Sequence, residues 1–182
     1  MYIMEQKSIL KSSIWKVFEI FVDEPAKIHF IKEISRKISL SPTSVKKHIE
    51  DLEKSQMIVR KKGERFFGYI ADRDNEKFLF YKKIFNIIKI KESGLLTSLS
   101  SALYPKAIVL YGSFFRGEDT EESDIDFFIL SEKNKHLNLE DFEKKLKRNI
   151  HLIIEPNLKK VNKNIRLEIL NGLVLEGYIK DE

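Results

Sequence analysis

The sequence predicts an α+β chain, with a helical module at the N-terminal end and a small mixed sheet at the C-terminal end. Two observations support this class. Apolar residues first follow helical spacing, and strand-like and helix-like segments alternate later in the chain. The charge balance changes along with the pattern: residues 1–70 hold 14 Lys and Arg against 9 Asp and Glu, whereas residues 92–182 hold 13 against 16. The front of the chain therefore suits a polyanionic partner, whereas the back either binds cations or is simply solvated.

The module boundaries follow from the same change in apolar pattern and charge. We expect a first module at 1–71, a helical connector at 72–104 and a second module at 105–182.

The chain has no cysteine, so neither disulfides nor cysteine-ligated zinc can stabilise it. No apolar run approaches the roughly 20 residues of a membrane span, and the first residues do not resemble a secretory signal. We expect a cytoplasmic protein without a membrane partner.

Three helices are predicted in the first module, at 8–21, 30–38 and 42–55. Ser41 and Pro42 form the expected start of the third helix, as an N-cap followed by proline at the first helical position. A hairpin is predicted at 57–70, because two apolar runs flank Lys62-Gly63-Glu64.

Three helices followed by a basic hairpin form the winged helix-turn-helix pattern, and this stretch resembles the DNA-reading half of bacterial and archaeal winged-helix regulators. Burial of Val45, Ile49 and Leu52 leaves hydroxyls and cations of the third helix on its solvent side, where they suit phosphates and base edges. The hairpin adds a cationic tip that could follow a phosphate backbone. The candidate DNA-binding residues are Thr43, Ser44, Lys46, Lys47, Arg60, Lys61, Lys62 and Arg65.

Winged helices also act as protein-interaction modules, so protein binding or homodimerisation is the alternative role for this part of the chain. A run of lysines is often only a solvated face.

A long helix is predicted at 74–90 and a shorter one at 94–103. The α/β pattern then begins. Strands are expected at 107–111, 124–130, 150–154 and 173–179, with helices at 139–147 and 164–170. The acidic run at 118–122, which links the first two strands, is predicted to be a solvated loop.

The turn between the first two strands carries the chemistry. Gly112 lets the backbone approach a phosphate closely, and Ser113 can donate its hydroxyl to a phosphate oxygen. A helix beginning near Phe114 would add free N–H groups. Strand alternation places Asp124 and Asp126 on one face, about 7 Å apart, where two carboxylates can share Mg²⁺. These acids are costly at the mouth of a buried strand unless they are paired or bound to metal.

The run VLYGSFFRGEDTEESDIDFFIL resembles the polymerase-beta-type nucleotidyltransferase superfamily, in particular its minimal members. Their signature is Gly-Ser, about ten residues, then Asp-hydrophobic-Asp. The resemblance covers about 105–179 and implies a Mg²⁺- or Mn²⁺-dependent transferase that uses an NTP, expected to be ATP. It implies phosphate contacts from Gly112, Ser113 and Arg116, and metal binding and catalysis by Asp124 and Asp126.

The superfamily adds a third carboxylate from a neighbouring strand, and here His151 stands at the matching position. Three alternatives follow. His151 acts as a metal ligand or base, or Glu155 is the third catalytic acid. In the third alternative, catalysis is lost while nucleotide binding remains.

Three functional hypotheses remain open. The first is transfer of a nucleoside monophosphate from an NTP to an acceptor hydroxyl, with a protein as acceptor in line with minimal family members. The second is a transcriptional regulator with a nucleotide sensor. The third is an antitoxin that neutralises a toxin partner by binding and represses its own operon.

Overall fold

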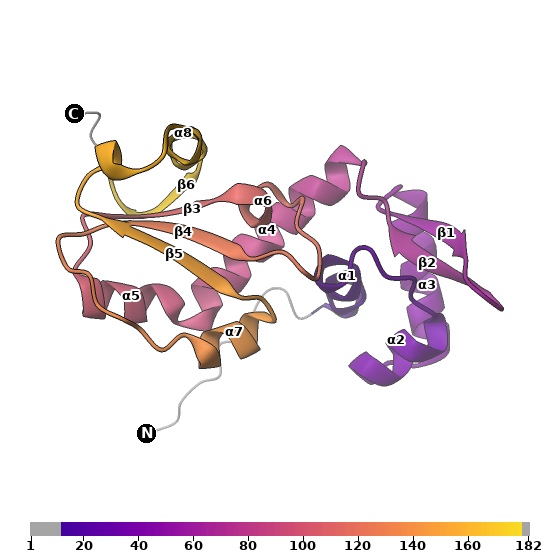
Figure 1. Cartoon of the computed structure of the whole chain (residues 1–182). Helices are drawn as coiled ribbons and strands as arrows, with labels where there is room; N and C mark the ends of the chain where they lie inside the picture. The colour runs from indigo at the N-terminus through magenta and orange to yellow at the C-terminus, as the bar shows by residue number, and fades with distance from the viewer. Residues whose placement is uncertain (1–11, 180–182) are drawn as a thin grey trace, which may run out of the picture. The chain divides into compact units, whose positions relative to one another are not determined.

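The computed structural model describes residues 12–179, and its contacts divide the chain into two compact units, Met1–Phe78 and Leu79–Glu182 (Figure 1). The elements of the first unit are α1 (Ser13–Asp23), α2 (Ile31–Ile38), α3 (Pro42–Lys54), β1 (Ile58–Lys62) and β2 (Phe67–Ala71). Residues 8–11 of the first predicted helix lie outside the described residues.

Helix α3 begins as the sequence predicts. The Ser41 side chain accepts a hydrogen bond from the backbone N–H of Ser44 at 3.2 Å, and Pro42 occupies the first turn. The inward residues Val45, Ile49 and Leu52 are buried, in agreement with the helical spacing. The cap and the apolar stripe therefore act together. The cap sets the residue at which the extended chain turns into helix, and the apolar stripe determines which face of the helix packs inward.

The hairpin pairs β1 with β2 in antiparallel register, from Ile58 opposite Ala71 to Lys62 opposite Phe67. His29 extends this sheet, because its backbone N–H and C=O both bond to Tyr69, at 2.7 and 2.9 Å. The imidazole of His29 is 1% exposed, and its Nε2 lies 2.9 Å from the carbonyl oxygen of Glu24. The ring also packs edge-on against Phe21, at a centroid distance of 5.1 Å.

The second unit contains the sheet. After α4 (Glu76–Ser93), which begins in the last residues of the first unit, its elements are α5 (Leu95–Leu103), β3 (Ala107–Tyr111), α6 (Gly112–Arg116), β4 (Ile125–Leu130), α7 (Glu140–Leu146), β5 (Ile150–Glu155), the 3-10 turn η2 (Leu158–Lys160), α8 (Lys163–Leu170) and β6 (Leu173–Gly177).

The four strands form a mixed sheet in the order β5-β4-β3-β6, as the α+β prediction requires. Strands β4 and β6 run antiparallel to β3, and β5 runs parallel to β4. The last strand is shorter than the predicted 173–179. It ends at Gly177, whose φ of +72° turns the chain so that the N–H of Tyr178 donates to the carbonyl of Lys106.

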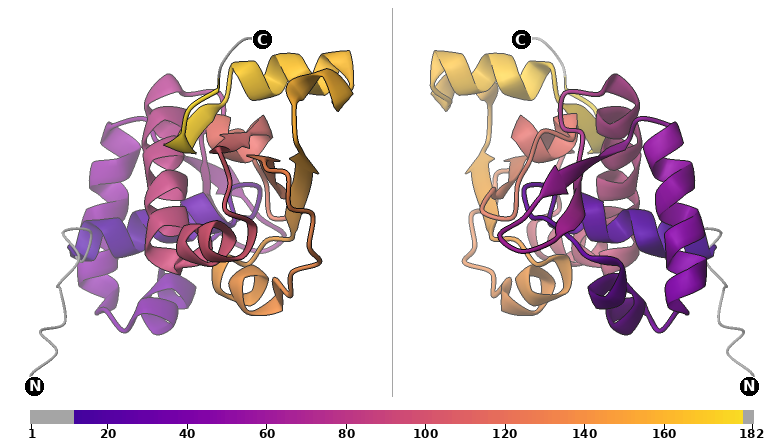
Figure 2. Two further views of the ribbon diagram at one scale, coloured as in Figure 1. Left: turned by 90° about the vertical axis from the view of Figure 1, so that its left-hand side faces the viewer. Right: turned by 90° about the vertical axis from the view of Figure 1, so that its right-hand side faces the viewer.

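Each face of the sheet packs against its own layer. Ile125, Phe127 and Ile129 face a core built with α4, α5 and α7, whereas Phe128 faces a smaller core with η2 and α8. Figures 1 and 2 show α8 on one side of the sheet and helices α5 and α7 on the other. By strand alternation Asp126 lies on the face of α8.

None of the helices within residues 12–179 combines the length and the apolar character that crossing a bilayer requires.

Burial lowers the pKa of His29 below its ordinary value of 6.5, because desolvation disfavours the imidazolium. The unfolded chain then binds the proton more readily, so this histidine's contribution to stability is complete above about pH 6.5 and is lost as the pH falls below it. We expect urea unfolding of the first unit to occur at a lower midpoint at pH 5.5 than at pH 7.5. Fluorescence of Trp15, the chain's single tryptophan, reports on this unit.

His29→Gln should reduce this difference between the two pH values, and His136→Gln, which changes an exposed loop histidine, should leave it unchanged. An equal pH dependence in all three proteins would contradict the assignment to His29.

Candidate functional site

The turn from β3 into α6 is shaped by a close approach between Gly112 and Asp126. Gly112 has a φ of +77°, a conformation that L-residues with side chains adopt only with strain. A Cβ at this position would also lie 2.6 Å from Oδ2 of Asp126. Glycine is thus required for the approach of a protein carboxylate, in addition to the predicted approach of a phosphate.

Asp126 is brought beside His151 by the parallel pairing of β4 and β5, in which the two residues are register partners. Nδ1 of His151 lies 3.2 Å from Oδ1 of Asp126. Their side chains are 27% and 58% exposed, for Asp126 and His151 respectively, so the pair is open to a ligand from solvent. On its other side Asp126 is the register partner of Tyr111, the last residue of β3.

Asp124 lies directly before β4 and is exposed. Its Oδ1 accepts a hydrogen bond from the Asn149 side chain at 3.1 Å, and the neighbouring N–H of Ile125 donates to the Asn149 carbonyl at 2.9 Å. Asn149 therefore orients the first aspartate of the motif. The sequence carried no signal for this role, which depends on the pairing of two distant segments.

Glu155 is not brought to this pair. It is the register partner of Leu130, and the β4–β5 pairing runs without a shift from Ile125 to Leu130. Glu155 therefore lies four residues along the strand from His151, about 13 Å at the usual rise per residue. Of the two residues considered for the third position, the structure brings His151 and not Glu155 to Asp126.

Ser113 and Arg116 lie on the short helix α6. Ser113 is half-buried, and its hydroxyl bonds to no protein group within residues 12–179. Arg116 is already paired: its Nε donates to Glu118 at 2.7 Å, and its Nη1 lies 3.7 Å from Glu168 on α8. Arg116 would have to exchange at least one of these carboxylates in order to contact a phosphate.

The electrostatics of the site favour cations. Tyr111 is 4% exposed, and burial, reinforced by the negative charges of Asp126 and Glu168, raises the pKa of its hydroxyl to about 12. The same carboxylates attract positive charge to this face of the sheet.

Within residues 12–179 no group of three or more His, Cys, Asp or Glu side chains is arranged to hold a metal ion. The two aspartates nevertheless fit the chemistry of Mg²⁺, which commonly binds through one or two carboxylates while waters and substrate phosphates complete its shell. Asp124 and Asp126 are the residues that could hold such an ion.

The prediction of a solvated loop at 118–122 is wrong for Asp119, which is 1% exposed. Oδ1 of Asp119 lies 2.9 Å from Nζ of Lys82 and accepts a hydrogen bond from Nδ2 of Asn86, also at 2.9 Å. Nζ of Lys82 donates in addition to the backbone carbonyl of Asp119. Nη2 of Arg148 lies 3.5 Å from the other carboxylate oxygen of Asp119. Lys82 and Asn86 are four residues apart on α4 and therefore share one face of the helix. This polar pair on an otherwise apolar face was the sequence feature that could have indicated a buried polar partner.

This buried network holds the loop that connects the two halves of the motif. Asn86 also donates to the carbonyl of Phe114 in α6, at 2.8 Å. Arg148 precedes Asn149, the partner of Asp124. The network therefore ties the Gly-Ser turn, the loop and the start of β5 to helix α4.

The candidate DNA-binding side chains of the first unit are all exposed. Four belong to the first half of α3, where Ser44 bonds to Ser41 at 2.9 Å and Nζ of Lys46 lies 3.9 Å from Glu50. The others lie on β1 and in the loop that follows it. His48 is half-buried and its Nε2 lies 2.8 Å from the Ser13 hydroxyl.

Sequence reasoning missed the aromatic part of this hairpin. Phe66 and Phe67 are 74% and 57% exposed, and the guanidinium of Arg60 lies 4.6 Å from the centre of the Phe67 ring. The hairpin thus presents apolar rings among its cations.

Comparison with known proteins finds a similarity for the second part of the chain. Residues 92–175 match the family model described as nucleotidyltransferase domain, so this segment is similar to that family. The matched segment contains the complete Gly112-Ser113 and Asp124-Ile125-Asp126 motif. No curated protein matches the chain.

Among solved structures, the chain is similar to a mutant of Lactococcus lactis ZitR, at 19% sequence identity and a TM-score of 0.38. The similarity covers 56% of this chain and 67% of that one, and it is too weak to support an inference.

Asp119→Ala would leave the ammonium of Lys82 buried without its carboxylate. We expect a loss of about 3–5 kcal/mol in the free energy of unfolding of the second unit, as is usual when one partner of a buried ion pair is removed. Thermal and urea unfolding followed by circular dichroism measures this change.

Glu122→Ala, in an exposed position of the same loop, is the matched control and should cost no more than about 0.5 kcal/mol. The double change Lys82→Met with Asp119→Leu should recover only part of the loss, because it removes the charges of Lys82 and Asp119 but leaves the guanidinium of Arg148 without this carboxylate. An Asp119→Ala protein as stable as the control would refute the role of the network.

Proposed function

We propose that the second unit transfers a nucleoside monophosphate from an NTP, expected to be ATP, to an acceptor hydroxyl in the presence of Mg²⁺ or Mn²⁺. The observation that carries this proposal is the meeting of Gly112, Asp126 and His151 at one end of the sheet, in the segment that matches the nucleotidyltransferase model.

The two aspartates would hold the metal, and the turn would hold the nucleotide. Asp124 and Asp126 supply carboxylate oxygens, and Asp126 is directly beside the backbone of Gly112. The bound ion would neutralise phosphate charge and activate the attacking hydroxyl. Ser113 would donate its hydroxyl to a phosphate oxygen. Arg116 would contribute charge after exchanging Glu118 or Glu168 for the nucleotide.

His151 is the residue we propose as the general base. Its Nδ1 interacts with Asp126, and a carboxylate partner orients an imidazole and stabilises its protonated form. The Nε2 atom is then the one available to take a proton from an acceptor hydroxyl.

A second candidate function rests on the same residue. A histidine stands where the superfamily resemblance implies a carboxylate, which favours a domain that binds nucleotide without transferring it. In that case the chain is a transcriptional regulator, or an antitoxin that acts by binding a toxin partner. For the transferase we propose a protein hydroxyl as acceptor, in line with the minimal members that the motif resembles.

We further propose that the first unit is a winged helix-turn-helix that binds DNA. Its support is the order α1, α2, α3, β1, β2, together with exposed cations on both α3 and the hairpin. Cations on both elements could contact phosphates on either side of a groove. Protein binding or homodimerisation is the alternative for the same surface.

Isothermal calorimetry with ATP and Mn²⁺ tests the metal assignment. Asp126→Asn should weaken binding at least about tenfold, because one charge-assisted contact of this kind accounts for that much. Asp141→Asn, which changes an exposed acid on α7, is the matched control and should bind as the parent does. Equal affinities for the parent and both variants would exclude Asp126 as a ligand.

Incubation with each labelled NTP, Mg²⁺ and cell lysate separates the transferase from the binding protein. The transferase requires labelled product from the parent, and His151→Ala should abolish it while ATP affinity changes little. A parent that is inactive with every NTP but binds ATP would support the second candidate, and His151→Asp could then create activity. Transfer that survives His151→Ala would refute the general-base role.

The DNA proposal is tested by salt dependence. Replacing Lys46, Lys47, Lys61 and Lys62 by Ala should reduce the slope of log affinity against log salt by about 0.9 for each phosphate that the variant no longer neutralises. Fluorescence titration on a selected duplex across salt concentrations measures the slope.

The matched control replaces four exposed lysines of the second unit, Lys91, Lys135, Lys160 and Lys163, and should leave the slope unchanged. Identical slopes for the two quadruple variants would favour a protein-binding first unit.

A further inference from the structure

A separate cavity opens on the same face of the sheet as Asp126, at the other end of β4. Its volume is about 650 Å³, within the usual range of small-molecule sites. Leu130, the last residue of β4, lines it and lies four residues from Asp126, about 13 Å along the strand. Neither Gly112, Asp126 nor His151 lines the cavity, so it is distinct from the candidate catalytic site.

The charged side chains that are known to line the cavity are all cationic. Lys106, Lys159 and Arg166 line the cavity, and no Asp or Glu among residues 12–179 does. Lys106 lies 3.4 Å from Glu132 in an exposed pair, whereas Lys159 and Arg166 form no ion pair within residues 12–179. Arg166 is also partly buried, and a guanidinium withdrawn from water is best compensated by an anion.

A neutral polar atom of the lining also lacks a partner. Oδ1 of Asn157 is buried and accepts no hydrogen bond from residues 12–179. Buried acceptors are rarely left unsatisfied, because the desolvation of the oxygen is then uncompensated. A ligand with an N–H or O–H donor would satisfy it once the Asn157 amide turns toward the cavity.

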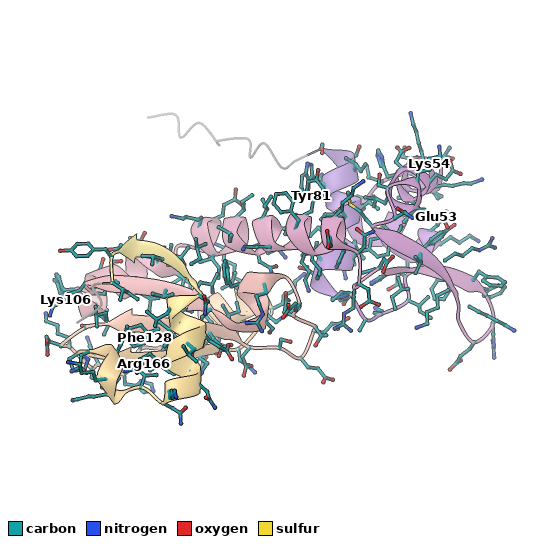
Figure 3. All side chains as sticks on the ribbon, turned by 90° about the horizontal axis from the view of Figure 1, so that it is seen from above. Glu53, Lys54, Tyr81, Lys106, Phe128 and Arg166 are labelled. Carbon is teal, nitrogen blue, oxygen red and sulfur yellow. The ribbon has the colours of Figure 1, made fainter. Side chains whose placement is uncertain are left out.

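The rest of the lining is mainly apolar, and three of its leucines come from η2 and α8. Leu158, Leu167 and Leu170 face the cavity, and the last two remain 53% and 48% exposed. Figure 3 labels Arg166 on α8, and Lys106 at the outer end of the sheet. The apolar part of a ligand would cover these leucines and remove from water the apolar surface that the protein alone leaves exposed, which would favour binding.

We propose that this cavity binds a small amphipathic anion, with an aliphatic or aromatic body, one oxyanion head group and a hydrogen-bond donor. The head group pairs with Arg166 and Lys159, the body contacts the leucines of α8, and the donor reaches Oδ1 of Asn157. The site is independent of metal and NTP, so it can be tested whether or not the transfer reaction occurs.

The probe is 1-anilinonaphthalene-8-sulfonate, which combines an aromatic body, a sulfonate and an N–H group. Its fluorescence is titrated on the full chain. The double variant Arg166→Gln with Lys159→Gln should bind it at least about tenfold more weakly, as the removal of one or two hydrogen bonds to charged groups predicts. Leu170→Trp should also weaken binding, because the larger side chain fills part of the cavity from an exposed position.

The matched control is Lys160→Gln with Lys163→Gln, which makes the same charge change on neighbouring residues outside the lining and should bind as the parent does. Decanoate or decyl phosphate should displace the probe, and the stronger competitor identifies the head group. Decanol, which has the same chain without the charge, should not compete. Equal binding by the two double variants, or equal displacement by decanol, would overturn the proposal, provided that all variants retain the parent's thermal unfolding.

Discussion

The parallel pairing of β4 with β5 is the constraint on which both sites of the second unit depend. Its register sets Asp126 beside His151 at one end and Leu130 beside Glu155 at the other. A shift of one residue would turn His151 to the opposite face, because side chains alternate along a strand. The apolar partners on both faces hold the register, since Ile125, Phe127 and Ile129 fill one core and Phe128 the other. The chemistry at one edge is therefore stabilised by packing along the whole strand.

The same face of the sheet carries opposite charges at its two ends. Carboxylates surround the turn at Gly112, and burial together with their charge raises the pKa of Tyr111. Cations surround the cavity beyond Leu130, where no carboxylate of the described residues 12–179 lines the wall. One end of the face thus suits a metal ion and the other an oxyanion. Helix α8 borders both ends, through Glu168 beside Arg116 and through Arg166 in the cavity.

Buried polar groups were the part that sequence reasoning handled least well. Asp119 lies in a run of acids that favours solvent, yet it is buried among Lys82, Asn86 and Arg148. Those partners come from segments about 30 or more residues away along the chain, so nothing local distinguished Asp119 from Glu118 or Glu122. Asn149 was missed for the same reason, because its contact with Asp124 exists only after β4 and β5 pair. Periodicity detects burial of apolar side chains, but it does not identify polar ones that find partners at a distance.

The amino-acid sequence by itself determined the elements and the motif. Apolar spacing, the Ser41-Pro42 cap and the turn residues placed α3 and β3 close to their observed bounds, because these signals act between neighbours. The Gly112-Ser113 and Asp124-Ile125-Asp126 spacing predicted a nucleotidyltransferase-like part, and the matching family model covers residues 92–175, which contain this motif. Only the tertiary structure decided between His151 and Glu155 as the neighbour of Asp126. Both have the parity that faces the site, and the choice depends on strand register, which is set by packing between segments that are separate in the sequence.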